Sequence, residues 1–251
     1  MDHAAYCTLT RDEIDRYADT IDGADLSAPV LTCPGWTVLA LTKHLGVVHR
    51  WAAQMLRDGA TERLDFRDVD RDLPADPSGY AAWLRDGGGA LVDMLAQREA
   101  DAAVWTWGPA HNAGWWARRM VHETLIHRAD AAEALGGEFT TTAELAVDGI
   151  DEFLANLPSA AASFAPNVLE LTGQGESLHF HATDAPGEWM VTLTADGFMW
   201  GHGHGKGDVA VRGPAADLLL MAYGRTPADH GRLQRFGDTG LLDRWLAYSA
   251  I

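Results

Sequence analysis

Residues 118–134, RRMVHETLIHRADAAEA, predict a long helix that places ionisable side chains on one face. Side chains four positions apart on a helix lie about 6 Å apart at Cβ, so Glu123 and His127 can bind one divalent ion. Asp130, three residues past His127, can hold that ring as an outer partner. Arg119 lies on the same stripe and is expected to meet a substrate anion or to pair with a carboxylate. Because a Glu and a His at this spacing are common in helices, a metal site needs a third ligand from elsewhere in the chain.

A second amphipathic helix, predicted from about residue 37 to 57, supplies that ligand. His44 lies on or beside its apolar stripe, so its ring is expected to point into a helical core. Two histidines and one carboxylate leave one position of a tetrahedral metal open, as in catalytic zinc sites. His49 and His122 are competing ligands, although His122 lies about 100° from Glu123 around the helix.

The remaining pattern predicts an α+β protein. A capping box at 10–13 predicts the start of a first helix. A third helix, over 78–98, is expected to be weakened by Gly87–Gly89. A fifth helix is expected to end before Pro158. After about residue 165, short alternating segments predict an antiparallel sheet with helices on one face. We therefore expect a helical bundle in residues 1–160 and a smaller α+β domain in residues 161–251. The predicted strands are VLELTG (168–173), SLHFHAT (177–183), EWMVTLT (188–194) and DVAVRG (208–213).

Composition argues against several classes of partner. The net charge of −17 argues against nucleic acid, because phosphate binding needs a concentrated basic face. The chain has no apolar run long enough to cross a bilayer, and its first residues lack the features of a signal peptide. We therefore expect a cytoplasmic protein without a membrane partner. Cys7 and Cys33 form no metal knuckle, and a buried structural thiol is favoured over a nucleophile for Cys33.

Three segments, in order, resemble one known family. CPGWTVLALTKHLGVVHRW (33–51) and RRMVHETLIHRADAAEA (118–134) resemble the metal-binding helices of the mycothiol-dependent maleylpyruvate isomerase family, within the DinB-like superfamily. LHFHATDAPGEWMVTL (178–193) with DVAVRGPAADLLLMAYGR (208–225) is similar to that family's small C-terminal domain. The resemblance spans roughly residues 30 to 245.

This resemblance implies a DinB-like four-helix bundle followed by a sterol-carrier-like α+β domain. It also implies zinc held by His44, Glu123 and His127, with Asp130 as a catalytic-site residue and Arg225 as the arginine that holds substrate. The thiol cofactor would be mycothiol, whose thiolate adds to a cis double bond, allows rotation and is eliminated. Stopping after addition would make the protein an S-transferase. The expected partners are a small-molecule substrate and a low-molecular-weight thiol, in a monomer or weak homodimer.

Other residues leave their roles open. Trp116, in the aromatic segment before Glu123, is expected to line a substrate or cofactor pocket or to pack between the two domains. Arg119 is the second residue expected to bind the cofactor. His202 and His204 fit a surface turn better than a metal site, and the pair at 179 and 181 shares one strand face, for which a structural role is favoured. A non-catalytic metal-binding or regulatory protein of the same fold is the alternative function.

Overall fold

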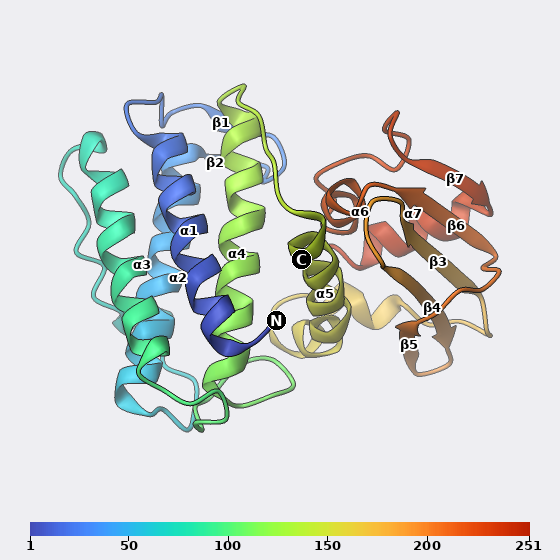
Figure 1. The fold of residues 1–251 in the computed structure, drawn as a ribbon, viewed down its shortest axis with the longest axis horizontal. Coiled ribbons are helices and arrows are strands. Elements are labelled where there is room, and N and C mark those ends of the chain that lie inside the picture. Colours follow the sequence, from blue (N-terminus) through green and yellow to red (C-terminus); the bar gives the residue numbers. More distant parts are fainter. The chain divides into compact units, whose positions relative to one another are not determined.

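The computed structural model describes all residues, 1–251, and is α+β, as predicted (Figure 1). The chain forms two compact units, Met1–Phe139 and Thr140–Ile251. The first unit is helical and the second contains the main sheet. No helix combines the length and the apolar character that are needed to cross a membrane.

Four helices build the first unit. Helices α1 and α2 each pack against both α3 and α4, which gives the four-helix arrangement that the sequence predicts. Two short antiparallel strands, β1 and β2, precede α2, and Thr37 caps that helix by accepting a hydrogen bond from the Ala40 amide at 3.3 Å. The elements are α1 (His3–Ile21), β1 (Pro29–Val30), β2 (Trp36–Thr37), α2 (Val38–Asp58), α3 (Tyr80–Ala96) and α4 (Ala113–Ala134).

Helix α1 begins earlier than the capping box predicts. Asp2 is the N-cap, and its carboxylate accepts a hydrogen bond from the Ala5 amide at 2.8 Å. Thr10 donates its hydroxyl to the Tyr6 carbonyl, and Glu13 is buried in an ion pair with Arg128 of α4 at 2.6 Å. The expected start at Thr10 is therefore wrong, because Glu13 serves tertiary packing and not the helix end.

Helix α3 runs without a break through Gly87–Gly89. A Cβ atom on Gly88 would lie 2.6 Å from the Cδ1 atom of Ile14 in α1. The missing side chain therefore allows the two helices to approach closely, and packing stabilises a segment that helix propensity alone would weaken.

The second unit contains a five-stranded sheet in the order β5-β4-β3-β6-β7. Strands β3, β4 and β5 form an antiparallel meander, but β6 pairs parallel to β3, so the expectation of a purely antiparallel sheet is wrong. After β5 the chain crosses the sheet, so that β6 pairs with the edge of β3 that β4 does not occupy. In this position β6 runs in the same direction as β3. The strands are β3 (Ser177–Ala182), β4 (Glu188–Thr194), β5 (Gly197–His202), β6 (Val209–Gly213) and β7 (Gln234–Gly237).

One face of this sheet is covered by helices, as predicted. Phe180 of β3 shares an apolar pocket with Phe153 of α5 (Ala143–Ser163), Leu218 of α6 (Ala215–Ala222) and Trp245 of α7 (Thr239–Tyr248). Helix α5 packs against α6, so it belongs to the C-terminal unit, whereas the sequence assigns it to a domain ending at residue 160.

Two local expectations in this unit are wrong. Helix α5 continues through Pro158 to Ser163, because its packing against α6 and the following turn outweighs one missing hydrogen bond. The expected strand at 168–173 overlaps instead a 3-10 helix, Pro166–Glu170, in which the alternating side chains find no neighbouring strand. The short edge strand β7 carries no alternation that the sequence could reveal.

Candidate metal centre

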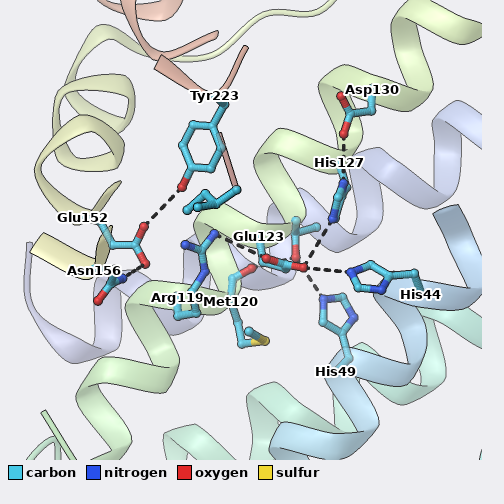
Figure 2. A network of polar contacts seen from close by, with 12 residues as sticks. His44, His49, Arg119, Met120, Glu123, His127, Asp130, Glu152, Asn156 and Tyr223 are labelled. Carbon is cyan, nitrogen blue, oxygen red and sulfur yellow. Dashed lines mark hydrogen bonds and ion pairs between the residues drawn. The ribbon is translucent and has the colours of Figure 1, made fainter. Parts of the chain in front are cut away.

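Helices α2 and α4 bring together the three predicted ligands. Figure 2 shows His44 of α2 and His127 of α4 directed at the carboxylate of Glu123. The Nε2 atom of His44 lies 3.3 Å from Glu123 Oε1, and the Nε2 atom of His127 lies 3.3 Å from the same oxygen. One ligand atom from each of the three side chains lies within 4.8 Å of the others.

These spacings fit a tetrahedral metal ion. Zinc bonds of about 2.0–2.2 Å to nitrogen and oxygen place neighbouring ligand atoms about 3.3–3.6 Å apart in a tetrahedron. Both distances from Glu123 are 3.3 Å and the three ligand atoms lie within 4.8 Å of one another, so one ion can bind all three side chains. Three protein ligands would leave the fourth position for another molecule.

Asp130 orients the ring of His127, as the spacing on α4 predicts. Its Oδ2 atom accepts a hydrogen bond from His127 Nδ1 at 2.9 Å, and its side chain is fully buried. Thr32 donates its hydroxyl to the other oxygen at 2.6 Å, and the Cys33 thiol lies 3.6 Å from Oδ2. Because the carboxylate holds the proton on Nδ1, the Nε2 atom is left to bind a metal.

The charges of the site come mainly from α4, with His44 of α2 as a further contact of Glu123. Burial would raise the pKa of Glu123, but hydrogen bonds from His127 and His44 and the charge of Arg119 hold it well below the ordinary value. Burial lowers the pKa of His127, but contacts with Asp130 and Glu123 outweigh this and raise it to about 9. Arg119 is buried, with Nη2 3.5 Å from Glu123 Oε2. Of the two roles expected for Arg119, the structure shows the pairing with a carboxylate.

Sequence reasoning missed part of the surroundings. Trp36 stacks edge-on against His44 with ring centroids 5.0 Å apart. His49 lies outside the ligand set, with Nε2 3.0 Å from the Thr124 hydroxyl, and burial lowers its pKa to about 3. Trp36 lies within the family-like segment 33–51, which was the available signal for it, whereas Thr32 lies one residue before that segment.

The other predicted site residues have different surroundings. Trp116 is fully buried, donates its indole N–H to the Trp105 carbonyl at 2.8 Å and packs against Trp51. Its role in cofactor binding stays a prediction, which this packing does not favour. Arg225 belongs to the C-terminal unit, where its guanidinium donates to the Tyr223 carbonyl at 2.6 Å, and its role as the substrate arginine also stays a prediction.

Comparison with known proteins tests the resemblance. The family model described as the mycothiol maleylpyruvate isomerase N-terminal domain matches residues 7–132, and the model of the C-terminal domain of the same family matches residues 144–244. The chain belongs to the mycothiol maleylpyruvate isomerase family. No curated protein sequence matches it.

Solved structures agree with this family in fold. A crystal structure of the mycothiol-dependent maleylpyruvate isomerase, and one of its histidine-to-alanine mutant, each match with a TM-score of 0.60 at 17% identity. Each match covers 94% of this chain and 93% of the other. A UbiJ-SCP2 ubiquinone synthesis protein matches over 44% of this chain and 93% of its own chain at 16% identity. Its TM-score of 0.32 is too low to support a shared fold. At these identities the isomerase structures establish the fold and do not assign the substrate.

Proposed function

We propose that this protein is a zinc-dependent enzyme that uses mycothiol to isomerise a maleyl-type double bond or to transfer the thiol to an electrophile. The observation that carries this proposal is the arrangement of His44, Glu123 and His127, whose spacing fits a tetrahedral ion with one open position. Family membership supports the thiol and the enzymatic role.

Two neighbouring charged side chains, Asp130 and Arg119, hold the proposed zinc ligands in position. Asp130 fixes the ring of His127 so that Nε2 faces the metal position, and Arg119 balances the charge of Glu123. Neither cysteine belongs to this ligand set, because Cys7 lies in α1 and Cys33 contacts Asp130. Cys33 forms a separate candidate group with His127 and Asp130. In this proposal the reacting sulfur is supplied by mycothiol. Zinc at this position would stabilise the thiolate of mycothiol, the nucleophile that either reaction requires.

Metal analysis tests the centre itself. Purified wild-type protein should bind one equivalent of zinc at the bundle, and His127→Ala should lose it. His111→Ala is the matched control, because His111 is exposed and lies just before α4, outside the ligand set. Full zinc binding by folded His127→Ala protein would remove the proposed centre.

A second measurement tests the reaction. The zinc form should bind mycothiol and the metal-free form should not, and with maleylpyruvate or an electrophile the zinc form should give isomerised product or a thiol adduct. Mass spectrometry and chromatography separate the two products. Zinc and mycothiol binding without turnover of any such compound would favour the non-catalytic alternative.

A further inference from the structure

A second group of metal-ligand side chains lies in the C-terminal unit and has no part in the proposed reaction. His179 and His181 stand on β3, Glu188 begins β4, and His204 follows β5. One ligand atom from each of these four side chains lies within 4.8 Å of the others. We propose that His179, His181, Glu188 and His204 bind a second divalent transition-metal ion of the zinc class.

The sheet itself positions three of the four ligands. His179 and His181 are two residues apart and so share one face of β3, and Glu188 is the direct cross-strand partner of His181. His179 Nε2 lies 3.1 Å from Glu188 Oε2, and His181 Nδ1 lies 3.3 Å from Glu188 Oε1. Each distance is near the roughly 3.3–3.6 Å between neighbouring ligands of a tetrahedral ion, and the two contacts use different oxygens of Glu188. His179 is buried, while His181 and Glu188 are partly exposed, so an ion can enter from solvent.

The glycine-rich segment after β5 supplies the fourth ligand. The Gly203 amide donates to the Glu188 carbonyl at 3.2 Å, which places the next residue, His204, beside Glu188. His204 Nδ1 lies 2.7 Å from Glu188 Oε2, although the His204 side chain is 79% exposed. A Cβ atom on Gly207 would lie 3.0 Å from the backbone nitrogen of His179, so this segment passes directly against β3. The segment is exposed at His204 and Lys206, as expected of a surface turn, and passes against the sheet at Gly207.

The chemistry of the four groups favours a metal over a purely structural hydrogen-bond cluster. Imidazole nitrogens with a carboxylate suit Zn²⁺, Cu²⁺ and Ni²⁺. The three rings, at centroid spacings of 5.5–6.5 Å, surround one carboxylate, with His179 and His204 at Oε2 and His181 at Oε1. A single ion satisfies all three rings and the carboxylate together.

Zinc stoichiometry of the full, untagged chain tests this site. Wild-type protein dialysed against buffered zinc should bind two equivalents, and His204→Gln should bind one. The double variant His44→Ala/His127→Ala, which removes the bundle ligands, should keep one equivalent. His202→Gln is the matched control, because His202 is an exposed neighbour that contacts Asp151 at 3.1 Å and lies outside the cluster. This design separates the two sites, so either can fail without the other.

Digestion with a lysine-specific protease gives a second readout. Lys43 and Lys206 are the two lysines of the chain, and Lys206 lies exposed between His204 and Gly207. Zinc should slow cleavage after Lys206 in the wild type and leave cleavage of His204→Gln unchanged. Equal zinc content in wild type and His204→Gln would overturn the proposal. So would zinc-independent cleavage after Lys206 in wild-type protein.

Discussion

Replacing Asp130 with asparagine should weaken zinc binding at the bundle site by about 10–100-fold, which corresponds to about 1.4–2.7 kcal/mol. The size of the effect follows from the 2.9 Å hydrogen bond between Asp130 Oδ2 and His127 Nδ1, made by a fully buried carboxylate. Asparagine keeps the shape but has one acceptor oxygen, so it cannot accept from both Thr32 and His127. The substitution therefore removes the negative charge behind His127 and one of these two hydrogen bonds. A neutral partner makes the imidazole a weaker ligand and holds it less firmly.

Competition with a zinc chelator of known affinity measures this change, and circular dichroism confirms that the variant is folded. Asp93→Asn is the control, because Asp93 is 63% exposed, pairs with Arg11 on the surface and lies outside the ligand set. The control should bind zinc like the wild type. An unchanged zinc affinity in folded Asp130→Asn protein would refute the argument that Asp130 supports the site through His127.

Two further predictions concern stability. Burial holds the pKa of His49 at about 3, far below its ordinary 6.5, so this ring stays neutral in the folded chain and takes up a proton on unfolding. The free energy of unfolding therefore falls as the pH falls below 6.5, and between pH 7 and 5 His49 accounts for a loss of about 2 kcal/mol. In urea unfolding, His49→Gln should lose about 2 kcal/mol less than the wild type over this pH range. An equal loss in both proteins would contradict the lowered pKa of His49. Gly46→Ala should lower the free energy of unfolding by about 1–3 kcal/mol, because the new Cβ would overlap the buried Trp83 ring. Gly89→Ala is its control, because the atom nearest to the new Cβ would be 3.6 Å away. The higher helix propensity of alanine should stabilise this variant by up to about 1 kcal/mol. Equal shifts in melting temperature for the two variants would argue against close packing at Gly46.

The parts of the site that lie within one helix could be predicted from the sequence. Glu123, His127 and Asp130 meet because helix geometry fixes their spacing, and the structure confirms each contact. The place of His44 required two inferences: an inward-facing stripe, and the resemblance to a known family. Thr32 was missed because its bond to Asp130 spans 98 residues and depends on the path of a turn, which periodicity does not encode.

The fold shows the same division between local and distant information. Periodicity predicts α5 as a helix, but an amphipathic face does not say which core it joins, and α5 packs with α6 in the second unit. Alternation predicts β3 and β6 as strands, but their parallel pairing depends on where the segment after β5 crosses the sheet. For the same reason the sequence places His179 and His181 on one face and gives no sign that His204 joins them.

The association of α5 with the sheet also bears on how such chains evolve. The boundary between Phe139 and Thr140 falls between α4 and α5, so a genetic crossover there interrupts no helix or strand. Each half would keep its own hydrophobic core, and all three bundle ligands would be inherited together. Recombination at this junction can therefore exchange the C-terminal unit for another while the inherited metal ligands stay intact.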